Sequence, residues 1–309
     1  MNITKNINKI INILFAVCLI SVLVIVSSDS LILLLSIPIM LTAVNIDYER
    51  IEFLSIIIAV ALISYLFIDT KNLALEFVPI ILLTLTLIIL SKISISDKGQ
   101  IAINFLIASL IFIGIYRYQM VNQGLDLKSM AEDLKEIFEQ NADYAIADET
   151  YELSLAMYPA VLSSLSLIYA VISLKLVRNF MAHRNKGKDM LALNNLRLSK
   201  KDALIIIGFA ALMELLLPTI FAIKKDFVIA NVIWIIASIL LLNGMLVYDY
   251  IMRRRRSSLS RGMQWFFVII FFYFFAIMFI VFGLADIFVD FRARKEEVWK
   301  IIKNQDMSI

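Results

Sequence analysis

The feature that most constrains this chain is a series of apolar runs too long for a soluble fold. In a soluble domain, polar residues interrupt such runs every few positions; here 61% of the residues are hydrophobic and only 18% are charged. A helix that crosses a bilayer needs roughly 20 apolar residues. Nine segments approach or exceed that need: 10–26, 31–45, 52–68, 73–91, 101–118, 153–177, 202–223, 227–249 and 263–287.

These segments predict an all-α, polytopic transmembrane helix bundle with about eight or nine spans. Lipid offers no hydrogen bonds to an open backbone, and the sequence lacks the alternating pattern of a membrane barrel. Segment 31–45 is short, so it either tilts across the membrane or enters it only partly. The lysines near the N-terminus precede an apolar run without a small-residue cleavage site, which favours a retained first span.

The distribution of lysine and arginine predicts a cytoplasmic N-terminus. With that orientation the inside loops carry 18 lysines and arginines and the outside loops carry 6, as the positive-inside rule requires. The basic C-terminal tail breaks the rule, because nine crossings leave it outside. Either the tail is external, or one segment fails to cross; a re-entrant 263–287 run repairs the parity without turning the basic loops outward.

We divide the chain into a five-segment membrane half (1–118), an acidic loop (119–152), a four-segment membrane half (153–291) and a charged tail (292–309). The loop carries nine acidic residues. Within it, helical spacing gathers Leu127, Met130, Ala131, Leu134, Ile137 and Phe138 on one face. This pattern predicts an amphipathic surface helix packed on the rim of the bundle; the alternative is a lid over a cavity.

The residue types present exclude most enzyme and metal chemistry. The only cysteine, Cys18, lies inside a span, and the only histidine, His183, lies in a basic loop. No nucleotide motif, nucleophile set or metal-ligand cluster is present, so we expect no enzyme, no cofactor and no metal site.

Glu214 is the most informative single residue. It lies 13 residues past Lys201, which is about 20 Å along a helix and near the middle of the membrane. An acid at that depth must face protein or water. Pro218 leaves the Glu214 carbonyl without its helical donor, so a carboxylate and a free carbonyl lie together. The pair suits a cation, an ammonium group or a proton; the alternative is a glutamate that only fixes helix packing.

A second set of polar residues lies in the spans. Glu76 and Pro79 repeat the glutamate–proline arrangement nearer an interface. Asn104, Asn231 and Asn243 are intramembrane amides, which join helices more often than they bind ligands. Together with Glu214 they are the candidate solute or ion ligands. The predicted kinks are at Pro38, Pro79, Pro159 and Pro218.

The cluster Arg253, Arg254, Arg255 and Arg256 directly follows a span. We interpret it as a cytoplasmic anchor on anionic lipid headgroups, since no folded basic domain accompanies it that would indicate nucleic acid.

Charged residues of both signs close the last apolar run. Asp286 and Asp290 are followed by Arg292 and Arg294. Carboxylates are unfavourable at a helix C-terminus, so these aspartates need partners. The spacing predicts a structural ion network made of these four residues; pairing with the arginines at 253–256 is an alternative if the last run turns back.

The stretch "GLADIFVDFR" at 283–292 resembles the C-terminal signature of the YybS-like family, multi-pass bacterial membrane proteins that carry a domain of unknown function. The stretches at 158–170, 196–200 and 231–250 resemble that family in the same order. The first half of the family is distantly similar to the substrate-binding subunits of energy-coupling-factor transporters. Those subunits dock on a membrane partner through small residues in the first helix, and "ILFAVCLISVLVIV" lacks such a pair.

Two functions follow from these observations. The first is transport-related: a polar cavity around Glu214 would bind a small cationic or vitamin-like solute. The second is a non-catalytic scaffold or regulator of the cell membrane, which would bind lipid or another membrane subunit through basic cytoplasmic loops. A membrane-embedded enzyme is disfavoured, and no nucleic-acid partner is expected.

Overall fold

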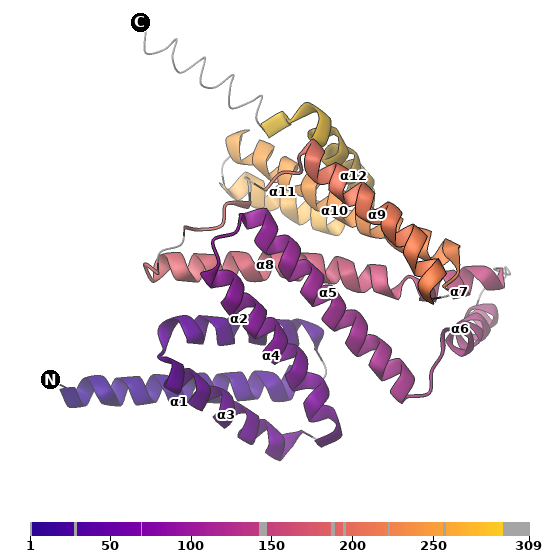
Figure 1. Ribbon diagram of the computed structural model, residues 1–309. Coiled ribbons are helices and arrows are strands. Elements are labelled where there is room, and N and C mark those ends of the chain that lie inside the picture. The colour runs from indigo at the N-terminus through magenta and orange to yellow at the C-terminus, as the bar shows by residue number, and fades with distance from the viewer. Residues whose placement is uncertain are drawn as a thin grey trace, which may run out of the picture. The chain divides into compact units, whose positions relative to one another are not determined.

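The computed structural model describes residues 2–27, 30–68, 70–141, 147–186, 189–193, 196–221, 223–255 and 258–292. Over these ranges the chain is helical and contains no strand, from α1 to α12 (Figure 1). The prediction of an all-helical fold is confirmed for this part of the chain.

The chain forms two compact units, which we describe separately. The first contains residues 1–124 and 165–191, and the second contains residues 125–164 and 192–309. The boundary cuts through α8 (Tyr158–His183), whose beginning belongs to the second unit and whose remainder belongs to the first.

The first unit contains α1 (Asn2–Ser27), α2 (Leu31–Asp47), α3 (Arg50–Phe67), α4 (Thr70–Lys92) and α5 (Asp97–Asn122). The first four of these pack side by side (Figure 1). Their core is aliphatic and includes Ile20, Ile37, Ile56 and Ile80, while most other apolar side chains of these helices are exposed. Outward apolar surface of this kind suits a lipid environment.

The second unit contains α6 (Leu127–Asn141), α7 (Asp148–Ala156), α9 (Lys200–Phe221), α10 (Lys225–Arg255), α11 (Ser258–Ile270) and α12 (Phe272–Val289). The closest packing is between α10 and α12, and α9 also lies against α10 (Figure 1). Helix α6 packs on α7.

Several helices have the length and composition of membrane spans. Seven qualify within the described residues: α1, α3, α5, the α7–α8 pair, α9, α10 and α12; the apolar parts Leu33–Asp47 and Phe77–Lys92 are shorter. The described part of the chain is therefore all-helical, with several apolar helices long enough to cross a membrane.

Three of the four prolines for which kinks are predicted lie in the interior of a helix. Pro38, Pro79 and Pro218 are inside α2, α4 and α9. Pro159 is different, because it is the second residue of α8. A first-turn proline removes an N–H that has no helical acceptor in any case, so Pro159 begins a helix and does not kink one.

The last apolar run is not one helix, contrary to the single segment predicted at 263–287. It breaks at Phe271, whose backbone leaves the helical region with φ −103° and ψ 31°. The break separates α11 from α12. Apolar periodicity could not reveal it, because both sides of the break are equally apolar and no proline or glycine marks it.

Candidate functional site

The second unit is built around a close approach of two helix backbones. A Cβ atom added at Gly244 of α10 would lie 1.8 Å from the Phe279 carbonyl oxygen of α12. One added at Gly283 would lie 2.0 Å from the Leu240 carbonyl oxygen. Because no side chain fits at these distances, the two glycines are what lets α10 and α12 touch; small residues have this role at many membrane helix interfaces.

A buried arginine follows this contact. The side chain of Arg292 donates from Nη2 to Asp286 Oδ2 at 2.6 Å and to Asn243 Oδ1 at 2.7 Å. Its Nη1 donates to the Leu196 carbonyl at 2.6 Å. The side chains of Arg292 and Asp286 are only 3% and 1% exposed. We call these four residues the Arg292 cluster.

Most of the remaining polar atoms of the Arg292 cluster also have hydrogen-bond partners. Asn243 donates from Nδ2 to the Gly283 carbonyl at 2.9 Å, and Asp286 Oδ1 accepts the backbone N–H of Phe291 at 3.1 Å. Only Nε of Arg292 lacks a partner within the described structure. The predicted solute ligand Asn243 is thus engaged by its own chain through both amide atoms.

The cluster shows which way α12 runs. Gly283 faces Leu240, and further along both helices the Tyr250 hydroxyl donates to the Arg292 carbonyl at 3.3 Å. Helix α12 therefore runs in the same direction as α10. Its last residues lie at the end of the unit where α10 ends and where the segment containing Leu196 leads into α9.

Helix α11, which connects α10 to α12 along the chain, must then fold back against both of them. Its Trp265 indole N–H donates to Asp249 Oδ1 of α10 at 3.1 Å. The same ring packs on Tyr248 of α10 and on Phe279 of α12, with centroids 5.6 and 6.4 Å apart. A continuous helix from α11 into α12 would hold Trp265 and Phe279 about 20 Å apart along its axis. The α11–α12 pair is thus sharply bent at Phe271.

Asp290 has a partner that the sequence did not indicate. It caps α12 in the left-handed conformation, with φ 48°, and Arg197 Nη1 donates to both of its carboxylate oxygens at 3.0 and 2.9 Å. Both side chains are nearly half exposed. Arg294, the expected fourth member of the network, lies outside the described residues. Arg256 also lies outside them, as do the side chains of Arg253, Arg254 and Arg255.

Asn231 joins α10 to the junction of α7 and α8. Its Oδ1 accepts the Ala160 N–H at 2.9 Å, and its Nδ2 donates to the Ala156 and Phe227 carbonyls at 2.8 Å. Ala160 follows Pro159 in the first turn of α8, and its N–H also lies 3.0 Å from the Met157 carbonyl, just before the helix. Asn231 therefore caps α8 from a neighbouring helix.

Asn104 joins α5 to α8 within the first unit. Its Nδ2 donates to Ser173 Oγ at 3.0 Å and approaches the Ala170 carbonyl at 3.5 Å. The side chain is fully buried, and its Oδ1 has no partner in the described part of the chain.

A second buried arginine was not singled out from the sequence. Arg178, near the end of α8, donates to Asp97 Oδ1 at 3.1 Å and to the Asp189 carbonyl at 3.0 Å. Gln100 adds an oxygen acceptor at 3.5 Å. Arg178 is 11% exposed and Asp97 is 40% exposed. The sequence marks the start of α5 at Ser96 and Asp97 but does not indicate that Arg178 pairs there.

The structure describes the side chain of only one of the two glutamates predicted as ligands. Glu214 lies half-buried on α9, and its side chain forms no hydrogen bond or ion pair with any residue that the structure describes. Pro218 lies one turn later in the same helix, as expected. Glu76 belongs to α4, but its side chain is outside the described part.

The acidic loop forms α6 and α7 beside each other. Asp126 begins α6 by accepting the Ser129 N–H at 2.7 Å, and this hydrogen bond lowers the pKa of its carboxyl group. Lys135 pairs with Asp148 at 2.8 Å, which raises the pKa of the lysine. Ala131 of the predicted apolar face is buried.

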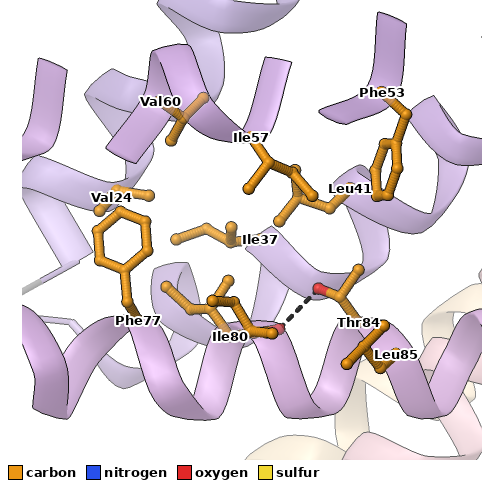
Figure 2. A pocket seen from close by; sticks show the side chains of 11 residues that line it. Val24, Ile37, Leu41, Phe53, Ile57, Val60, Phe77, Ile80, Thr84 and Leu85 are labelled. Atoms are coloured by element: carbon orange, nitrogen blue, oxygen red, sulfur yellow. Dashed lines mark hydrogen bonds between the residues drawn. The ribbon is translucent and has the colours of Figure 1, made fainter. Parts of the chain in front are cut away.

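Figure 2 shows a small cavity in the first unit, with a volume of about 40 Å³. The side chains around it come from α1, α2, α3 and α4 and are apolar except for Thr84, whose hydroxyl donates to the Ile80 carbonyl. Of the predicted ligand residues whose side chains the structure describes, none lines it. The lining is Val24, Ile37, Leu41, Phe53, Ile57, Val60, Phe77, Ile80, Ile81, Thr84 and Leu85.

Comparison with known proteins adds no assignment. No protein-family model, no curated protein and no solved structure matches the chain. Among the described residues, no group of three or more His, Cys, Asp or Glu side chains could hold a metal ion.

Proposed function

We propose that this chain is a multi-pass protein of the cell membrane that works as a non-catalytic scaffold or regulator. Its working surface is the basic cytoplasmic end, where the segment before α9 and the arginines after α10 meet lipid headgroups or another membrane subunit. The observation that carries the proposal is the use of the intramembrane polar groups. Asn231, Asn243 and Asp286 all bind their own chain, and Asn104 does so through its amide nitrogen.

The direction of α12 supports a topology in which the basic tail lies at the same end of the membrane as the other basic loops of its unit. Because Arg292 lies beside Tyr250 and Leu196, the bent α11–α12 pair returns to the end of the unit where it began. We infer eight crossings followed by a re-entrant hairpin. This arrangement puts Arg292 at the end of the second unit where α10 ends and α9 begins, so the tail after it obeys the positive-inside rule together with the basic residues of that end.

The proposal predicts that charge at this end controls binding. In the variant in which Arg253, Arg254, Arg255 and Arg256 are all replaced by glutamine, we expect weaker binding to vesicles or nanodiscs containing phosphatidylglycerol. Each basic residue near such a surface contributes about 1 kcal/mol. The control replaces Lys224 and Lys225, at the opposite end of α10 in the same unit, by glutamine. Equal binding by both variants would contradict the proposal.

Transport is the second candidate, and Glu214 is the observation that favours it. A half-buried acid in a span with no partner in the described chain is costly unless a cation, a proton or water reaches it. Glu214→Gln separates the two functions. If a small cation stabilises the wild type against thermal unfolding and no longer stabilises this variant, transport gains support. If a screen of cations and vitamins stabilises neither, the scaffold proposal is favoured.

A further inference from the structure

One side chain holds three parts of the second unit together. The guanidinium of Arg292 touches Asn243 on α10, Asp286 on α12 and the carbonyl of Leu196 in the segment before α9. The segment from Ala192 to Ser199 forms no α-helix in its described residues. Leu196 is nonetheless buried. Its position therefore depends on contacts made from outside its own segment.

These contacts behave as one unit for a physical reason. Asp286 is almost fully buried, and a buried carboxylate is retained only when a cation pairs with it. Arg292 supplies that cation and uses a different nitrogen for Leu196, since a guanidinium presents several donors in a fixed planar fork. Removing Arg292 withdraws the donor from Leu196 and the counter-charge from Asp286 at the same time.

We propose that Arg292 is a latch that docks the segment before α9 against the α10–α12 pair. With the latch engaged, residues 196–199 and the end of α12 form one fixed cytoplasmic-end surface. With the latch released, the segment is free while α9, α10 and α12 stay helical. This inference does not depend on whether the protein is a scaffold or a transporter.

The other end of the same connection offers a matched control. Leu191 is also buried, but it belongs to the first unit, where Arg178 binds the carbonyl of Asp189. Loss of Arg292 should therefore expose position 196 and leave position 191 protected. A general loss of structure would expose both.

The experiment measures thiol accessibility in the full-length protein in membrane vesicles. Cys18→Ser removes the natural thiol, which is exposed. Single reporters are then introduced as Leu196→Cys or Leu191→Cys, and the rate of modification by N-ethylmaleimide is followed. In Arg292→Gln we expect the rate at 196 to rise at least about tenfold, as for local opening of a docked segment, and the rate at 191 to stay unchanged.

Two further variants keep the test decisive. If Arg292→Gln does not fold, the double variant Asp286→Asn with Arg292→Gln removes the buried charge together with the latch, and the same rise at 196 is expected. Arg292→Lys keeps the charge without the planar fork and should give an intermediate rate. An unchanged rate at 196 in a folded variant, or an equal rise at 191 and 196, would overturn the proposal.

Discussion

The two units each contain a buried arginine, and the two sites differ in how much water reaches the partner carboxylate. Arg292 and Asp286 are 3% and 1% exposed, whereas Arg178 and Asp97 are 11% and 40% exposed. Both arginines also bind a backbone carbonyl outside their own helix. The difference teaches that the same residue type can be an obligatory counter-charge in one unit and a replaceable tether in the other.

The largest expected effect is at Arg292. Arg292→Met should lower the free energy of unfolding by about 3–5 kcal/mol, because it leaves the buried carboxyl group of Asp286 without its partner. Thermal and denaturant unfolding followed by tryptophan fluorescence would measure it. The double variant Asp286→Leu with Arg292→Met should recover most of the loss. If the double variant is as unstable as the single one, the buried charge is not the cause.

The second-largest effect is expected at the close contact between α10 and α12. Gly283→Ala should cost about 1–3 kcal/mol or more, because its methyl group would overlap the Leu240 carbonyl and push α10 and α12 apart. Gly208→Ala on α9 is the control, since nothing lies within 4 Å of a Cβ at that position. We expect the control to be neutral or stabilising, as alanine favours a helix over glycine. Equal losses would show that the close approach is unimportant.

A smaller effect is expected at the other arginine. Arg178→Met should destabilise the first unit by about 1 kcal/mol, the usual value of a lost hydrogen bond, because water can solvate the half-exposed Asp97. The same unfolding measurements apply. A loss as large as that of Arg292→Met would remove the distinction between the two arginines.

The smallest effect concerns a carboxylate that is fully solvated. The pKa of Asp126 is lowered in the folded protein. The Asp126 carboxylate therefore stabilises α6 fully above the unfolded pKa of 3.8, and this stabilisation is lost as the pH falls through the lower folded pKa. Amide exchange at Ser129 should therefore be slower in the wild type than in Asp126→Ala at pH 6. At pH 2 the two should exchange alike; a difference that persists there would contradict the assignment of the carboxylate as the cap.

Part of the candidate site was predictable from the sequence. The intramembrane asparagines were named as candidate ligands, with helix joining as the commoner role of such residues, because an amide in lipid needs partners on a neighbouring helix. The need of Asp286 for a partner also followed from its place at the end of an apolar run. The choice of partner did not follow, since Leu196, Asn243 and Arg292 are far apart in the chain and meet only through packing.

Other features could not be predicted from the sequence, because nothing in the neighbouring residues marks them. The break at Phe271 has no proline or glycine beside it, and the residues on both sides are apolar and aromatic. The sequence distinguishes Arg178 in no way from the other basic residues near it, although its side chain binds Asp97 and the Asp189 carbonyl. Composition and periodicity report the environment of a segment, and they do not report which carbonyl a side chain will reach.

The sequence by itself determined the helices and their apolar character, because lipid and the 3.6-residue period act on neighbouring residues. Tertiary structure alone decided that α12 returns beside α10, that Arg197 pairs with Asp290, and that Arg292 binds three separate segments. Those outcomes depend on the contact of Gly244 and Gly283 with backbone atoms of other residues, and contacts between distant positions arise only when the chain is packed.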